Sequence, residues 1–222
     1  QLVGSDGELI RFTIDAYSSS TVVTGRAHRT VPTSLRGVET SNWTYAKSEI
    51  SGLWHLEGED VSVFGDGFVV ANPNNEAYVI VTVENGQITL DKPYGVVHVG
   101  LPITADVETL NIDSNQSQTI SDKRLTVNRV SLHVKDTRGL WVGAQPPTDD
   151  STDNLEGLTE LKLRNDETMD DPISLKTDVV DVVIESQWNN NGRIFIRQVD
   201  PVPATITAIV PDGIFPFKNV GT

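Results

Sequence analysis

The residues best suited to chemistry gather in one glycine-rich stretch, residues 52–67. Here His55 and three acids, Glu57, Glu59 and Asp60, fall within six positions. A histidine can move protons near neutral pH, and two carboxylates on facing elements can cleave a glycosidic bond. Spacing along the chain does not show which carboxylates face one another. These residues are therefore candidates for acid–base chemistry, and turn or surface positions are the simpler interpretation.

The rest of the chain offers little for nucleophilic or metal chemistry. The four histidines, His28, His55, His98 and His133, are dispersed, and no pair has the short spacing of a metal motif. There is no cysteine, which excludes a disulfide framework and a thiolate ligand or nucleophile. No G-x-S-x-G elbow occurs. The sequence predicts structural histidines, no catalytic residue and no cofactor.

One acidic segment matches part of a metal-binding template. Asp149, Ser151, Asp153 and Glu160 fall at positions 1, 3, 5 and 12 of a calcium loop, but Asn154 replaces the glycine at position 6. Eleven acids against three basic residues give residues 149–181 a charge of −8. A solvated acidic loop is the simpler interpretation, and weak calcium binding is the alternative.

Short strands with strong turn signals dominate the chain. Asn85-Gly86 separates the apolar runs 78–83 and 87–90, and both turn residues tolerate the positive φ of a type I′ hairpin. Asp66-Gly67 is placed similarly. Between Val127 and Val130 the apolar alternation slips by one residue, which predicts a β-bulge.

The later segments also read as strands. Residues 178–187 are rich in valine and predict a central strand, which 189–192 would turn into a hairpin with 193–199. No segment sustains a helical period, so the predicted fold class is all-β. We expect an antiparallel β-sandwich from residues 1–50 and 101–222, with a small β-barrel-like unit inserted at 51–100.

Composition limits the classes of function. The 222 residues carry a formal charge of −14, which argues against binding nucleic acid through a basic face. No apolar run reaches the length of a membrane span. The chain begins at Gln1 and runs directly into a turn, as expected for a segment of a longer or processed protein.

Several short motifs follow one another in a recognisable order. They are Gly52-Leu53-x-His55-Leu56-Glu57-Gly58 with Val61-x-Val63 and Asp66-Gly67; Asn85-Gly86-x-Ile88-Thr89-Leu90; Val97-His98-Val99-Gly100-Leu101-Pro102; Arg138-Gly139; and Gly192-Arg193-Ile194-x-Ile196-x-Gln198 with Asp200-Pro201-Val202-Pro203. In this order they resemble the tail nozzle, or tail tubular B-type, proteins of short-tailed bacteriophages, also labelled phage stabilisation proteins. The resemblance covers most of residues 26–210 and departs from the family pattern at Gly65 and Ile103.

The resemblance implies a structural protein of the phage virion. Such chains assemble as a ring, usually a hexamer, beneath the portal and an adaptor, and the ring extends the channel for DNA ejection. The expected partners are copies of the chain itself, the adaptor, and a tail spike, fibre or needle. DNA would pass through the lumen without specific binding, because a negative wall repels phosphate. The family carries no catalytic residues, so none is transferred.

Two other classes of function stay open. Trp43, Trp54, Trp141 and Trp188 could form stacking platforms of a carbohydrate- or host-surface-binding β-module. The clustered acids could serve a glycan-degrading enzyme. Two matches to the glycosylation pattern, at Asn42 and Asn115, are read as chance.

Overall fold

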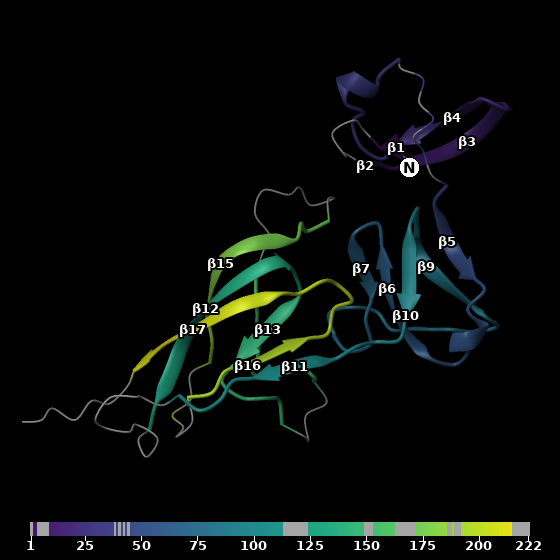
Figure 1. Ribbon diagram of the computed structural model, residues 1–222. Helices are drawn as coiled ribbons and strands as arrows, with labels where there is room; N and C mark the ends of the chain where they lie inside the picture. The colour runs from purple at the N-terminus through teal and green to yellow at the C-terminus, as the bar shows by residue number, and fades with distance from the viewer. Residues whose placement is uncertain are drawn as a thin grey trace, which may run out of the picture.

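The computed structural model describes an all-β chain (Figure 1). The residues described are 2–3, 9–37, 39, 41, 43, 45–112, 124–148, 153–162, 172–185, 188 and 192–214. The strands are β1 (Leu2–Val3), β2 (Leu9–Ile10), β3 (Phe12–Ser19), β4 (Val22–Ala27), β5 (Lys47–Ser51), β6 (Asp60–Gly65), β7 (Phe68–Ala71), β8 (Val81–Thr82), β9 (Gln87–Tyr94), β10 (Val97–Gly100), β11 (Ala105–Glu108), β12 (Thr126–Thr137), β13 (Leu140–Gly143), β14 (Thr159–Glu160), β15 (Lys176–Val183), β16 (Phe195–Gln198) and β17 (Ile206–Ile214). Two short 3₁₀ helices, η1 (Thr33–Leu35) and η2 (Trp54–Leu56), complete the set. The named strands pair antiparallel, which confirms the predicted fold class.

The C-terminal half is a sandwich of two sheets. One sheet has the order β15-β12-β17 and the other the order β11-β16-β13-β14. Both contribute to one core, in which Val130 and Leu132 of β12 pack with Leu140, Val142 and Ile196 of the facing sheet. Burying these side chains between two sheets is the main source of stability for such an architecture.

β12 contains the predicted bulge. Its pairing with β17 shifts register between Val127 and Arg129. Val127 and Val130 are both buried while the two residues between them are exposed. The extra residue keeps both valines on the core face despite the slip in alternation, so this prediction is confirmed.

Residues 47–100 form a second unit with its own core. β10, β6 and β7 make one sheet, with β8 also paired to β6, while β5 pairs with β9. Asp66 and Gly67 have φ of 50° and 86°, and Asn85 and Gly86 have φ of 55° and 67°, as type I′ turns require. The two sheets are separate and do not close, so the predicted barrel-like form is corrected to a pair of open sheets around one core.

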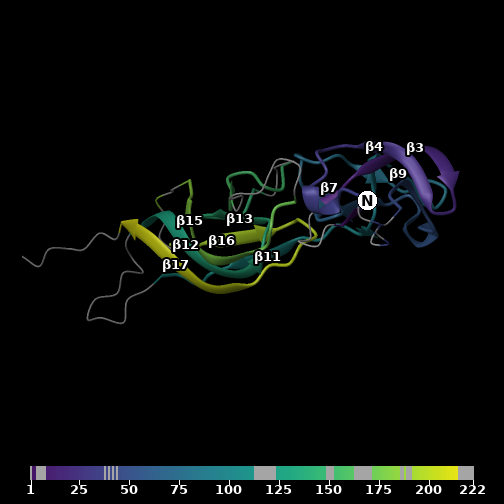
Figure 2. The same ribbon diagram turned by 90° about the horizontal axis from the view of Figure 1, so that it is seen from above.

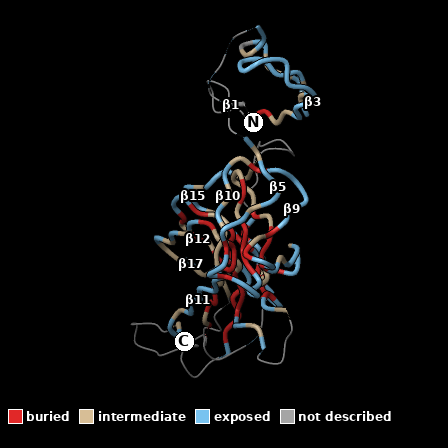
Figure 3. The backbone as a smooth tube through the Cα atoms, turned by 90° about the vertical axis from the view of Figure 1, so that its right-hand side faces the viewer, coloured by how far each residue is buried: buried red, intermediate tan, exposed pale blue. Residues whose placement is uncertain are grey.

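Residues 1–50 are arranged differently from the predicted grouping with 101–222. β3 and β4 form a two-stranded hairpin, β1 pairs with β2, and β5 joins β9. Among the residues described, no strand from 1–50 pairs with a strand of the C-terminal sandwich. Seen from above, the hairpin lies at the far end of the molecule from β17 (Figure 2). Burial is concentrated in the body below it, and most of the hairpin is exposed (Figure 3).

The predicted hairpin of 178–187 with 193–199 is not formed. β15 pairs with β12 at an edge of one sheet, while β16 lies in the other sheet between β11 and β13. The valine-rich strand is therefore an edge strand, and β12 is central. Local alternation reports that a strand forms but does not identify its neighbours, which long-range packing decides.

The centre of β12 offers a direct test of the sandwich core. Leu132 is fully buried, so Leu132→Ala should lower the free energy of unfolding by about 2–5 kcal/mol, measured by urea denaturation. Leu110 is 87% exposed, so Leu110→Ala is the matched control and should change stability by less than about 0.5 kcal/mol. Equal losses in the two variants would contradict the described core.

Candidate assembly surface

Two acids of the glycine-rich stretch, Glu57 and Asp66, hold turns in place. Glu57 accepts hydrogen bonds from the backbone N–H of Asn85 at 2.8 Å and of Gly86 at 2.6 Å. Asp66 accepts from the N–H of Gly95 at 3.0 Å and of Val96 at 2.9 Å. These carboxylates cap backbone amides of neighbouring turns. Their positions assign them a structural role.

The histidines are distributed over several elements. His28 lies 2.6 Å from the Thr13 hydroxyl, and the His98 ring lies 6.5 Å from the Phe64 ring. His55 belongs to η2 and His133 to β12. Within the described part of the chain, no three His, Cys, Asp or Glu side chains are placed to hold a metal ion.

The structure describes only part of the candidate calcium loop. Asp149 and Ser151 lie outside the described residues, as do Asn42 and Asn115 of the glycosylation patterns. Asp153 accepts a hydrogen bond from the N–H of Leu155 at 2.8 Å. Glu160 lies in β14, where burial raises its pKa and the charge of Asp200 raises it further. Calcium binding there stays a prediction.

A buried polar network joins the 47–100 unit to the C-terminal sandwich. The Asn72 amide donates to the Val199 carbonyl and to the Asp200 carboxylate, each at 3.0 Å. The Asn72 side-chain oxygen accepts from the N–H of Asn74 at 3.1 Å. Asn72 is 0% exposed and Asp200 is 6% exposed. Buried polar groups stabilise a contact when their hydrogen bonds are made, as they are here.

Arg138 makes a second connection between the two units. Its Nη1 donates to the Gly67 carbonyl at 2.9 Å and to the Ile173 carbonyl at 2.8 Å. Its guanidinium lies 5.9 Å from the Phe64 ring centroid. The neighbouring Gly139 has φ of 72°, and a Cβ there would lie 2.8 Å from the Cβ of Asp200. The turn therefore requires glycine in order to approach Asp200 this closely.

Burial sets the ionisation of this network. Burial is the main cause of the raised pKa of Asp200. Hydrogen bonding from Asn72 and the charge of Arg138 lower this pKa and so partly oppose the effect of burial. Burial likewise raises the pKa of Tyr78 to about 12, and lowers that of Arg138. Sequence reasoning missed this network, whose partners Asn72 and Asp200 are 128 residues apart. The sequence feature that could have indicated the network is that Asn72 and Asp200 are each followed by proline and each lie beside an apolar strand.

The β3–β4 hairpin, residues 12–27, has one apolar face. Ile14 pairs with Gly25 and Tyr17 with Val23, with a register shift between them. Cross-strand partners share a face, and alternate residues of β4 share it too. The bulge between Ile14 and Ala16 therefore places Phe12, Ile14 and Tyr17 together with Val23.

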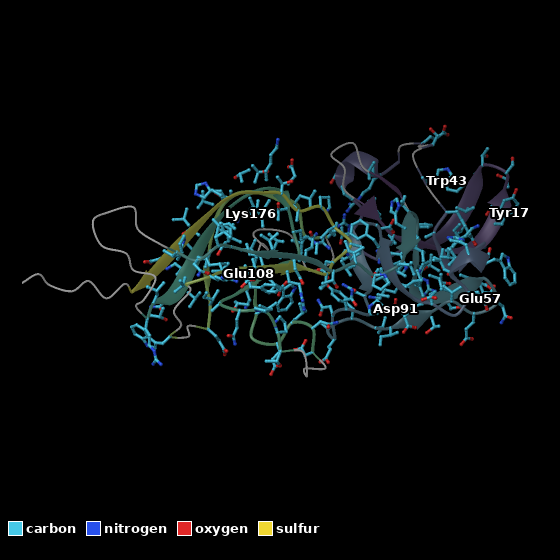
Figure 4. All side chains as sticks on the ribbon, turned by 60° about the horizontal axis from the view of Figure 1, so that its bottom comes forward. Tyr17, Trp43, Glu57, Asp91, Glu108 and Lys176 are labelled. Carbon is cyan, nitrogen blue, oxygen red and sulfur yellow. The ribbon has the colours of Figure 1, made fainter. Side chains whose placement is uncertain are left out.

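This apolar face is uncovered. Tyr17 is 72% exposed, Ile14 48% and Val23 44%. Figure 4 shows Tyr17 at the edge of the molecule. An isolated two-stranded hairpin is at best marginally stable in water, and large uncovered apolar patches mark interaction sites.

The base of the hairpin is fixed to the body. Arg11 lies 3.9 Å from the Asp66 carboxylate and sits 5.7 Å from the Phe68 ring centroid and 5.2 Å from that of Tyr94. Ile10 beside it is fully buried. The hairpin is thus an arm that is anchored at one end and exposed along its length.

Charge is distributed unevenly between the segment that carries the arm and the rest of the chain. Residues 9–37 contain four arginines and one aspartate, a charge of +3, whereas residues 38–222 contain thirteen basic and 28 acidic residues, a charge of −15. The overall charge of −14 conceals this asymmetry. Counting charge by segment shows this asymmetry from the sequence alone.

The chain was compared with protein-family models and with curated proteins. No protein-family model matches the chain, and no curated protein sequence matches it. Among the residues described, none of the helices has the length and apolar character needed to cross a membrane.

The ionisation of Asp200 predicts a specific pH dependence. Because its pKa is raised in the fold, the folded chain takes up a proton at a higher pH than the unfolded chain does. The Asp200 contribution to stability should therefore grow as pH falls from neutral through the raised pKa. In urea denaturation between pH 7 and 4, wild type should gain stability relative to Asp200→Asn. A difference that is flat or has the opposite slope would contradict this assignment. Asp212→Asn, at an exposed position of β17, controls for removing one charge.

The Arg11 anchor predicts a local effect. Arg11→Gln removes the cation over two rings and beside the Asp66 carboxylate. It should lower the local opening free energy of residues 12–27 by about 1–2 kcal/mol. Hydrogen exchange should show faster exchange in β3 and β4, with the sandwich core unchanged. Arg26 is 80% exposed in its pair with Asp15, so Arg26→Gln should change exchange much less. Equal effects from both variants would refute the anchoring role.

Proposed function

We propose that the chain is a structural subunit of a bacteriophage tail nozzle that acts by oligomeric assembly and without catalysis. The observation that carries this proposal is the anchored arm with its uncovered apolar face. A monomer gains nothing from exposing Ile14, Tyr17 and Val23 in this way, whereas a subunit covers them on assembly. The ordered motifs that resemble tail nozzle proteins support the choice of this assembly.

The proposed partners follow from that role. Copies of the chain form a ring, six-fold as in the proteins it resembles, with an adaptor on the portal side and a spike, fibre or needle on the other. The acidic body suits a DNA channel, because a negative wall repels the phosphate backbone and lets DNA slide. The charge of −15 on residues 38–222 supports this feature of the proposal.

A second candidate is a carbohydrate- or host-surface-binding module. Trp43, Trp54 and Trp188 are 58%, 69% and 56% exposed, and exposed tryptophans can stack on sugar rings. One of them already has an intramolecular role, since the Trp54 ring lies against Gly86, where a Cβ would approach it to 2.5 Å. A glycan array separates the candidates: selective glycan binding that is lost in Trp43→Ala would favour the second.

Two measurements test assembly: the molecular mass of the particles and their appearance by electron microscopy. Light scattering and electron microscopy of the chain, alone and with adaptor and spike proteins, should show rings. The triple variant Ile14→Ser, Tyr17→Ser and Val23→Ser should shift the population toward monomer, because assembly no longer buries apolar surface.

The opposite face of the hairpin supplies the control. Ala16→Ser with Thr24→Ser alters the same two strands on that face and should leave the rings intact. A monomer under every condition, with neighbouring tail proteins present, would contradict the proposal.

A further inference from the structure

The C-terminal sandwich has an open apolar groove on one side. It has a volume of about 610 Å³ and lies between β11 and β17. Its lining is largely aliphatic and includes Ala105 and Val107 of β11, Ile196 of β16, and Ile206 and Ile209 of β17. Such a groove is suited to apolar side chains.

The groove is bordered by two strand edges. β11 ends the order of one sheet and β17 ends the order of the other, so neither has a second neighbour among the described strands. An open edge presents backbone N–H and C=O groups that can pair with a strand from another chain.

An exposed apolar rim continues this surface beside β11. Leu101 is 56% exposed, Ile103 49%, Val107 49% and Leu110 87%. These four large apolar side chains lie within ten residues of one another in the sequence, and Val107 also lines the groove; exposed apolar side chains of this kind are ones that partners cover. Below, the groove and this rim together are called the β11–β17 groove.

The arm of the same molecule does not lie at this groove. Figures 1 and 3 place β3 and β11 on opposite sides of the body. In Figure 4, Tyr17 of the arm and Glu108 of β11 are likewise far apart. The Arg11 contacts hold the base of the arm on the 47–100 unit. An occupant from this chain must therefore come from a second copy.

We propose that the β3–β4 arm of one copy docks in the β11–β17 groove of the next. This inference rests on the proposed function and names the contact between neighbouring subunits. The face formed by Ile14, Tyr17 and Val23 would cover the apolar lining, and an edge of the hairpin would pair with an open strand edge. Because two different surfaces meet, the contact is head to tail, and repeating it closes a ring when the rotation allows.

Charge complementarity favours a second copy as the occupant. The hairpin itself is neutral, but the segment that carries it, residues 9–37, has a charge of +3, and the body that would receive it, residues 38–222, has a charge of −15. Close to the groove the acids are already matched: Arg197 contacts Asp106 at 2.7 Å and Arg193 contacts Glu108 at 3.1 Å. The attraction is therefore long-range and steers the approach of the arm, while the contact itself is apolar. Added salt should slow association more than it weakens the finished ring.

Cysteine cross-linking tests the contact without background, since the chain has no native cysteine. Tyr17→Cys protein is mixed with Val107→Cys protein, assembled, and oxidised or treated with a short bismaleimide. A covalent dimer that combines the two variants is expected on a non-reducing gel. Val183, which is 71% exposed on the opposite edge strand β15, gives the matched control: Val183→Cys should not link to Tyr17→Cys.

The outcomes separate this inference from the proposed function. Light scattering of the same samples reports assembly independently of the link. Rings without a 17–107 link, or with an equal 17–183 link, would overturn the docking site and leave the nozzle proposal standing. Absence of any oligomer with the tail partners present would overturn both. Binding of a fluorescent DNA duplex that is lost in Arg26→Ala with Arg36→Ala, without the 17–107 link, would make the arm a nucleic-acid contact and overturn the inference.

Discussion

The arrangement of this molecule depends on the buried contact between Asn72 and Asp200. Asn72 reaches from the 47–100 unit to the end of β16 and satisfies a carboxylate and a carbonyl that are otherwise shielded from water. Losing the Asn72 donor while the carboxylate stays buried would cost several kcal/mol, so this arrangement of the two units requires the contact. Arg138 adds a second link to the Gly67 turn. Together these contacts hold one unit on the other.

That junction has a consequence for the proposed assembly. The arm is anchored to the 47–100 unit through Arg11, and the β11–β17 groove belongs to the C-terminal sandwich. Because the junction fixes the two units, it also fixes the direction of the arm relative to the groove. A fixed angle between two complementary surfaces determines the rotation between subunits, and so whether the ring closes. In the proposed ring the polar network contributes through geometry, and its buried acid has a structural role.

Sequence reasoning succeeded where the deciding interactions are local. Two-residue turns at Asp66-Gly67 and Asn85-Gly86 and the bulge in β12 were predictable, because backbone conformation and alternation within a few residues determine them. It failed where the deciding contact is distant. The two strands predicted to form a hairpin, observed as β15 and β16, lie in different sheets, and Asn72 meets Asp200 across most of the chain. The apolar face of the arm was visible only in part: Phe12 and Ile14 alternate in the sequence, but a bulge near Asp15 interrupts the alternation before Tyr17.

A density map of the assembled ring would test the account most directly. It would show which surface of each subunit receives the β3–β4 arm of its neighbour. The account predicts that the face with Tyr17 lies in the β11–β17 groove of the adjacent copy, with Asn72 and Asp200 still in contact in every subunit. A ring in which the arms project into the lumen or into solvent, while the groove stays empty or holds another element, would contradict it.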